Sequence, residues 1–438
     1  MFSLIFALAI IFCLIRSFQK TFVFVIVCSI WLMHFQSGLS GGLTFYSIIS
    51  LASFIVFLTK ERNVFRNMLS FPLWLPFIAT AFSFLCTNYI VGPPHTPRTI
   101  SIFFPIMLNL YVSWVLIKRH PRQMTMHFII ISLIYGSFIA FYNMIELALQ
   151  SNPLVELFVK SELYNTEGKI LEAYRYGIKR VQSIFLMHTT NGCACTLLFV
   201  TLLYAYINTD MLKRYKNLTI VVLPLLFLSV LFTGARSCII GMFVCSLCVL
   251  NKRYMTVRYT IPLLLLCFAT WFLANDYTSE VYNSIVNSDK AHLGSSESMR
   301  QGQLDLSLYF MFQSPWLGNG IGYTWNYVHE NYQNEILGAE SLWFPIMIDR
   351  GLLGVMAMAL YWLYLLAISF KHNRKILFFV LGILLMNSMS SLPCFEPMNT
   401  YIYLIILLAL PSKMRTKEYL GKLKNIQFSG SRSFLSLS

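Results

Sequence analysis

The chain has 438 residues, of which 57% are hydrophobic and only 12% are charged. A soluble protein of this length carries far more charge, so the composition excludes a soluble enzyme and indicates a polytopic membrane protein. The formal charge of +15 does not indicate a nucleic-acid partner, because Lys and Arg lie mainly in short connections and in the C-terminal tail, as the positive-inside rule requires.

Apolar segments of helix length recur along the chain and predict an all-α integral membrane bundle of about 12–13 transmembrane helices. They cover residues 2–15, 21–35, 40–58, 70–90, 99–117, 126–149, 184–207, 217–233, 236–250, 257–274, 342–370, 376–391 and 399–411. The first segment has neither a basic n-region nor a small-residue cleavage site, so we expect a retained helix. Because it is short, twelve spans with the N-terminus inside are the alternative. The bundle occupies residues 1–412, and residues 413–438 form a basic, Ser-rich tail.

Basic residues mark alternate connections between the apolar segments. They are Arg16 and Lys20; Lys60, Arg62 and Arg66; Lys118, Arg119 and Arg122; Lys213, Arg214 and Lys216; Lys252, Arg253 and Arg258; Lys371, Arg374 and Lys375; and Lys413, Arg415 and Lys417. The positive-inside rule places these connections and the C-terminal tail in the cytoplasm. Both long polar insertions, residues 151–182 and 275–340, are then extracytoplasmic.

Cysteine and histidine residues do not predict a metal site. Cys245 and Cys248 form a C-x-x-C pattern, but they lie in an apolar segment with no histidine partner, so we expect small buried hydrophobic residues. The histidines have no spacing typical of metal ligands. We therefore expect neither a metal nor a cofactor.

The first candidate site is the link Thr233–Ser237 between two apolar segments on the predicted outer face. Thr233 can cap a helix and Gly234 allows a tight turn, so we expect a helix to begin near Arg236. A helix N-terminus beside an arginine suits a phosphate group. The alternative is an interfacial arginine that extends to lipid headgroups.

Arg300 is the second candidate. Residues 275–340 contain eight acidic residues but only two basic ones, Lys290 and Arg300. An arginine in an acidic loop is commonly a salt-bridge partner, and a phosphate ligand is the other interpretation.

Residues 314–322 read Ser-Pro-Trp-Leu-Gly-Asn-Gly-Ile-Gly. The pattern contains G-x-G, but no strand precedes it, so it does not predict a dinucleotide site. It predicts a tight turn that folds the outer loop back onto the bundle.

Glu340 and Ser341 stand where the chain returns to the membrane. Ser341 can cap the next helix and the helix dipole stabilises a carboxylate there, so one interpretation is a well-formed helix start. The other is that Glu340 is a general base, because a partly desolvated carboxylate can take the proton of an attacking hydroxyl. The two are compatible.

Arg175, Lys179 and Arg180 place three basic residues within six positions on the predicted outer face. This charge runs against the positive-inside trend. It indicates a site for an anionic lipid headgroup or a pyrophosphate.

Together these features resemble the O-antigen ligase and Wzy-type polymerase superfamily of bacterial surface-polysaccharide assembly. The resemblance covers the number of spans, the late outer loop, T-G-x-R-S at Thr233–Ser237, an arginine about fifteen residues before P-x-L-G-x-G-x-G, and G-L-L-G at Gly351–Gly354. It implies transfer of a glycan from an undecaprenyl pyrophosphate donor to an acceptor hydroxyl outside the membrane, without nucleotide or metal. It also implies that Arg236 and Arg300 hold the pyrophosphate, with Arg180 as a looser match and Arg175 in the same loop.

One departure separates the branches of this superfamily. The ligases carry a histidine, in an H-N pair, where this chain has Ala339-Glu340-Ser341. The resemblance therefore favours a polymerase of lipid-linked repeat units in the bacterial inner membrane, with Glu340 as the base. A chain-length regulator and a flippase are the implied protein partners. Aromatic residues of the outer loop could stack on sugars or anchor the loop at the membrane surface: Trp316, Tyr323, Trp325, Tyr327 and Tyr332.

Three alternatives stay open. A ligase would use the same donor with another acceptor. A transporter or flippase should carry ionisable residues on broken helices at mid-membrane, whereas the apolar segments here contain few, with Glu146 near one end and Asp349 and Arg350 in the re-entry. A non-catalytic scaffold leaves the one-sided polar loops unexplained.

Overall fold

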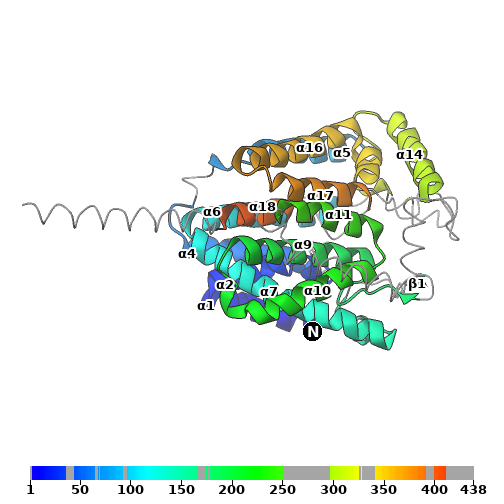
Figure 1. Cartoon of the computed structure of the whole chain (residues 1–438). Coiled ribbons are helices and arrows are strands. Elements are labelled where there is room, and N and C mark those ends of the chain that lie inside the picture. The colour runs from blue at the N-terminus through cyan, green and yellow to red at the C-terminus, as the bar shows by residue number, and fades with distance from the viewer. Residues whose placement is uncertain are drawn as a thin grey trace, which may run out of the picture.

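The computed structural model describes residues 2–35, 44–64, 68, 70–91, 96–164, 174–175, 178–249, 296–324, 327, 341–390 and 399–410. At some helix and strand ends, including Arg175, only the backbone is described. These residues form a helical bundle (Figure 1), which confirms the predicted all-α class. A single short antiparallel hairpin occurs among them, in which β1 (Tyr174–Arg175) pairs with β2 (Ile178–Lys179).

The helices follow the predicted apolar segments closely. They are α1 (Phe2–Arg16), α2 (Phe18–Val27), α3 (Ser29–Leu32), α4 (Phe45–Lys60), α5 (Trp74–Val91), α6 (Thr96–Arg119), α7 (Pro121–Leu149), α8 (Pro153–Lys160), α9 (His188–Asn208), α10 (Lys216–Phe232), α11 (Arg236–Ser246), α14 (Ser296–Gln313), α16 (Trp343–His372), α17 (Leu377–Ser388) and α18 (Asn399–Ala409), with 3-10 turns at Lys213–Tyr215 and Leu247–Val249. Each predicted segment has a helix except 257–274, which lies outside the described residues. Both predicted outer insertions contain helix, in α8 and α14.

Four helices of the described part are long and apolar enough to cross a membrane: α7, α9, the stretch Lys213–Phe232 and α16. Shorter apolar helices accompany them, among them α1, α4, α11 and α17. In lipid a helix is favoured because it pairs every backbone N–H and C=O internally. The chain is therefore a helical membrane protein, while the total number of spans stays a prediction.

α9 lies at the centre of one part of the bundle, because it packs against α7, α10 and α11. α11 in turn packs along α17, and α17 contacts α16, which also contacts α5 and α14. In Figure 1, α14 stands at the edge of the bundle, beyond the ends of α11 and α17. This order brings the segments that carry the predicted site residues to one end of the helices.

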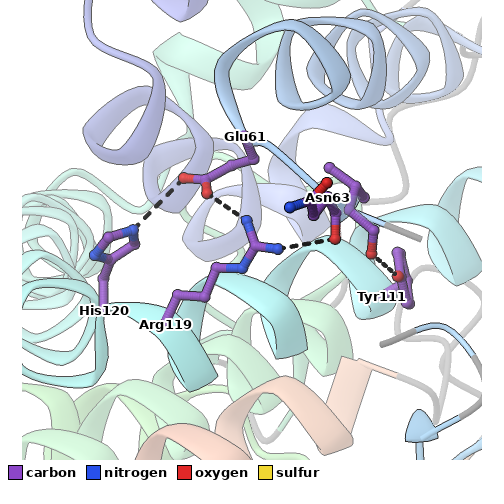
Figure 2. Close-up of polar contacts among 6 residues, drawn as sticks. Glu61, Asn63, Tyr111, Arg119 and His120 are labelled. Carbon is purple, nitrogen blue, oxygen red and sulfur yellow. Dashed lines mark hydrogen bonds and ion pairs between the residues drawn. The ribbon is translucent and has the colours of Figure 1, made fainter. Parts of the chain in front are cut away.

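The opposite end gathers the basic connections, and we call it the basic end. Figure 2 shows how Glu61, just after α4, accepts a 2.8 Å ion-paired hydrogen bond from Arg119 Nη1 at the end of α6. His120 Nε2 lies 3.6 Å from the same carboxylate. Asn373 Nδ2, after α16, donates to the Tyr204 hydroxyl of α9 at 3.4 Å. The connections after α4 and α6 therefore meet, as do the end of α9 and the connection after α16, while residues 252–258 and 413–417 lie outside the described part of the chain.

Candidate functional site

The turn between α10 and α11 has the geometry that the sequence predicts. Gly234 has a φ of +61°, which glycine adopts without a steric penalty. Thr233 Oγ1 donates to the Val230 carbonyl at 2.6 Å and accepts the Ala235 N–H at 3.3 Å. α11 begins at Arg236, as predicted, although Ala235 rather than Thr233 occupies the N-cap position.

Arg180 reaches this same turn. Its Nε donates to the Thr233 carbonyl at 2.8 Å, and the N–H of Val181 donates to the Phe232 carbonyl at 3.2 Å. The structure therefore brings Arg180 to Thr233 at the end of α10. Thr233 stands three residues before Arg236 in the chain. Arg175 lies in β1, and its side chain lies outside the described part of the structure.

Arg300 lies in the first turns of α14, and its Nη2 donates to the Met389 carbonyl at 3.1 Å. Met389 is the C-cap residue of α17. An arginine at this position satisfies a terminal carbonyl and complements the negative end of the helix dipole. Arg300 therefore connects α14 to the end of α17.

α11 and α17 are antiparallel, and this decides where Arg236 lies. Gly241 of α11 faces Met386 and Gly382, whereas Cys245, one turn further along α11, donates its thiol to the Phe379 carbonyl at 3.3 Å. Residue numbers rise along α11 as they fall along α17. The start of α11, with Arg236, therefore lies at the same end of the helix pair as Met389, the partner of Arg300.

The return of the chain into the bundle also meets the end of α17. The N–H of Leu342 donates to the Asn387 carbonyl at 2.9 Å, and Trp343 Nε1 donates to Ser388 Oγ at 2.9 Å. Ser341 Oγ accepts the N–H of Trp343 at 3.2 Å, but Leu342 rather than Ser341 occupies the N-cap position of α16, so the predicted cap is wrong. Glu340 lies outside the described residues, so its role as a base stays a prediction; its neighbour Ser341 is buried.

The glycine-rich segment 314–322 is a turn, as predicted, and it packs against a break in α16. The N–H groups of Asn319 and Gly320 donate to the carbonyls of Ile348 and Asp349 at 2.9 and 3.1 Å. The Asp349 carboxylate accepts hydrogen bonds from the Gly322 N–H at 3.0 Å and from the N–H and hydroxyl of Thr324 at 2.8 and 2.6 Å. We call this set of contacts the Asp349 clasp; sequence reasoning placed Asp349 in the re-entry without this role.

The loop aromatics fall into two groups. Tyr323 and Tyr327 pack on Phe310 of α14, with ring centroids 5.5 and 4.9 Å away. Trp316 is 64% exposed. Trp325 and Tyr332 lie outside the described residues. Tyr323 and Tyr327 thus help to fold the segment after α14 onto that helix, while Trp316 faces outward.

Glu146 was not predicted as a functional residue, yet its carboxylate binds the segment that follows Arg180. Oε2 accepts the N–H groups of Gln182 and Ser183 at 3.0 and 2.7 Å, and Oε1 accepts Asn152 Nδ2 at 3.1 Å. Its side chain is fully buried at the end of α7. A single acid in the last turn of an apolar segment is the signal that could have drawn attention to it.

Cys245 and Cys248 are buried, as expected for small apolar side chains. Among the described residues, no group of three or more His, Cys, Asp or Glu is placed to hold a metal ion.

No family model matches this sequence, and no curated protein is significantly similar to it. The resemblance to the ligase and polymerase superfamily therefore stays a prediction from the ordered motifs.

Proposed function

We propose that this protein is a membrane glycosyltransferase that polymerises undecaprenyl-pyrophosphate-linked oligosaccharide repeat units on the outer face of the bacterial plasma membrane. The observation that carries the proposal is a convergence. Arg180 contacts the turn before Arg236, and Arg300 contacts the end of α17, beside which α11 begins. Three arginines that are far apart in the sequence are thus carried to one end of the bundle, opposite the basic end.

The chemistry of these groups suits a pyrophosphate leaving group. Arginine donates several N–H groups in a planar fork that matches phosphate oxygens, and the first N–H groups of α11 add a positive partial charge. When the bond between the anomeric carbon and the pyrophosphate oxygen breaks, its electron pair passes to the pyrophosphate. Arg236 and Arg300, with Arg180 and Arg175, stabilise that charge.

The acceptor hydroxyl supplies the other half of the reaction. Its oxygen forms the new bond to the anomeric carbon while Glu340 takes its proton, and displacement from the opposite face inverts the anomeric centre. The chain that follows Glu340 contacts the end of α17 through Leu342 and Trp343, which bind Asn387 and Ser388, next to the Met389 carbonyl that binds Arg300. This position supports a base close to the donor site.

The orientation belongs to the same proposal. The basic end faces the cytoplasm together with the C-terminal tail, and the arginine end faces outward, where lipid-linked repeat units are presented. The donor and membrane lipid are the ligands, and a flippase and a chain-length regulator are the proposed partners.

One observation bears on the transporter alternative. α16 is interrupted at Gly351, next to Asp349 and Arg350, and a broken helix with charged residues is typical of transporter sites. The Asp349 carboxylate, however, accepts three hydrogen bonds from Gly322 and Thr324, so its visible role is to hold the preceding turn. This favours the enzyme.

The test is complementation of a strain that lacks the gene. Arg236→Ala and Arg300→Ala should leave only single repeat units on the acceptor, because the donor is no longer held. Arg374→Ala, at the basic end where Arg374 covers the Phe370 ring at 4.9 Å, is the matched control and should restore normal polymer. Immunoblots of membranes establish equal insertion.

The product separates the alternatives. Polymer that accumulates on its lipid carrier when the gene is absent would identify a ligase instead. Purified protein in detergent should lengthen lipid-linked repeat units without a sealed membrane, and a transporter would not. Normal polymer from both arginine variants would overturn the assignment of the donor site.

A further inference from the structure

Residues 179–185, which we call the strap, form an irregular segment that is tied down along its length. Side chains from α7, the α7–α8 connection, α9 and the segment after α8 hold its backbone. The contacts are Lys179 N–H to Gln150 Oε1 at 3.1 Å, Asn191 Nδ2 to the Val181 carbonyl at 3.1 Å, Gln182 and Ser183 N–H to Glu146 at 3.0 and 2.7 Å, Asn152 Nδ2 to the Ser183 carbonyl at 2.6 Å, and the Tyr164 hydroxyl to the Ile184 carbonyl.

Glu146 is the centre of this arrangement. One oxygen accepts two successive N–H groups, those of Gln182 and Ser183, and Ser183 has a φ of +56°. A non-glycine residue in this conformation is strained, and it persists where the surroundings enforce it. Here two N–H groups converge on the Glu146 carboxylate, and the hydrogen bonds that they form with it stabilise the strained conformation.

Hydrogen bonds from Ser183 and Gln182, and to a smaller extent the charge of Lys179, compensate for the burial of the carboxylate. Glu146 and Lys179 are both 0% exposed, and Lys179 interacts favourably with the carboxylate. A buried carboxylate is costly unless hydrogen bonds and an opposite charge compensate for lost hydration. Lys179, which the sequence suggested as part of an anion site, is therefore directed inward and stabilises the strap.

Arg180 follows Lys179, and its side chain extends from the strap to the turn between α10 and α11. It is partly exposed, and its Nε bonds to the Thr233 carbonyl in the turn before Arg236. Val181 on its other side is fully buried and bonded to the Phe232 carbonyl. Buried anchors on both sides of Arg180 hold its backbone against the α10–α11 turn.

We infer that Glu146 is a positioning residue: it fixes the strap so that Arg180 is held beside the start of α11, where Arg180 contacts a phosphate of the lipid-linked donor. This inference rests on the proposed function. Glu146 itself does not touch the donor.

The experiment measures binding of undecaprenyl pyrophosphate to the full chain in lipid nanodiscs. Glu146→Gln keeps the shape but leaves one acceptor oxygen where the carboxylate has two, so it cannot accept both the strap N–H groups and Asn152 Nδ2. We expect the Kd to rise about tenfold, as for loss of one hydrogen bond to a charged group. Arg180→Ala should produce a similar rise. Glu156→Gln is the control, because this partly exposed carboxylate is bonded to Lys160 of its own helix, at 3.4 Å, in the part of the chain that the structure describes.

The decisive measurement is the double variant. If Glu146 acts through Arg180, Glu146→Gln adds nothing to the Kd once Arg180 is alanine, whereas independent effects would multiply. Hydrogen exchange of a peptide covering the strap should also be faster in Glu146→Gln, since the donors that hold the strap in place lose one of their two acceptor oxygens. Should Glu146→Gln fail to insert, Gln150→Ala loosens the strap at Lys179 alone and should raise the Kd in the same direction.

The possible failures are distinguishable. If Arg236→Ala and Arg300→Ala weaken binding but Glu146→Gln and Gln150→Ala do not, or if the double variant shows multiplied effects, the positioning role is wrong and the proposed function stands. If none of the arginine variants alters the Kd, the proposed donor site is wrong, and the inference about Glu146 fails with it.

Discussion

Gly382 of α17 lies so close to Gly241 of α11 that a β-carbon on Gly382 would stand 2.8 Å from the Gly241 carbonyl oxygen and 2.7 Å from the Cys245 backbone nitrogen. Small residues allow this approach, and in membranes tight packing is a main source of helix association. The contact sets the spacing between α11 and α17. Because Arg236 begins one helix and the partner of Arg300 caps the other, it also sets the relative position of the two arginines.

Gly382→Ala should therefore destabilise the protein. The added methyl group cannot be accommodated without separating the two backbones, and overpacking of this kind costs about 1–3 kcal/mol. Thermal unfolding of detergent-purified protein should show a lower Tm. Gly136→Ala is the control, because the nearest atoms to its added carbon lie at 3.5 Å, which is ordinary contact distance. Equal Tm values for the two variants would show that α11 and α17 can move apart freely.

Gly351→Ala should disrupt α16 more severely. Gly351 has φ +59° and ψ −156°, a conformation that is essentially restricted to glycine, and a β-carbon there would lie 2.6 Å from the Gly318 backbone nitrogen. We expect a loss of about 2 kcal/mol or more. Expression and Tm measure this, with Met356→Ala, a half-exposed position on the same helix, as control. A stable Gly351→Ala variant would mean that the break in α16 is not required.

Asp349→Asn tests the Asp349 clasp. An amide retains one acceptor oxygen, so it cannot satisfy both the Gly322 N–H and the two donors of Thr324. Leaving a buried donor unpaired costs about 1–3 kcal/mol. We expect this loss of stability to affect mainly the segment after α14. Limited proteolysis should cut that segment faster. Asp305→Asn on α14, where Gln301 Nε2 donates to an exposed carboxylate at 3.0 Å, should leave cleavage unchanged.

Arg300→Lys separates a general need for charge from a need for the guanidinium. Lysine keeps the charge but lacks the planar fork that holds the Met389 carbonyl and matches phosphate. We expect shorter polymer with Arg300→Lys and a loss of about tenfold or more in rate with Arg300→Ala, measured with purified protein and lipid-linked repeat units. Arg374→Lys should behave as the parent protein. Full activity of Arg300→Lys would show that the positive charge at this position is sufficient and that the guanidinium is not required.

Predictions that depended on local chemistry agree with the structure. The described apolar segments are helices, α11 begins at Arg236, and residues 314–322 form a turn. Each follows from hydrophobic length or glycine conformation, which act over a few residues of the chain.

Other features could not be predicted because their partners are distant in the sequence. Glu146 binds N–H groups 36 and 37 residues away, and Arg300 binds a carbonyl 89 residues away. Nothing near Glu146 in the chain indicates that a strained loop supplies its donors. The sequence likewise showed Lys179 and Arg180 as equal members of a basic cluster, whereas the fold buries one and leaves the other partly exposed.

The sequence alone determined that this is an all-helical membrane protein and where the described helices run, since lipid demands long apolar helices. Only the tertiary structure decided that Arg180, Arg236 and Arg300 belong to elements that meet at one end of the bundle. That meeting depends on antiparallel packing of α11 and α17 and on backbone groups paired across long stretches of chain, and no local pattern encodes it.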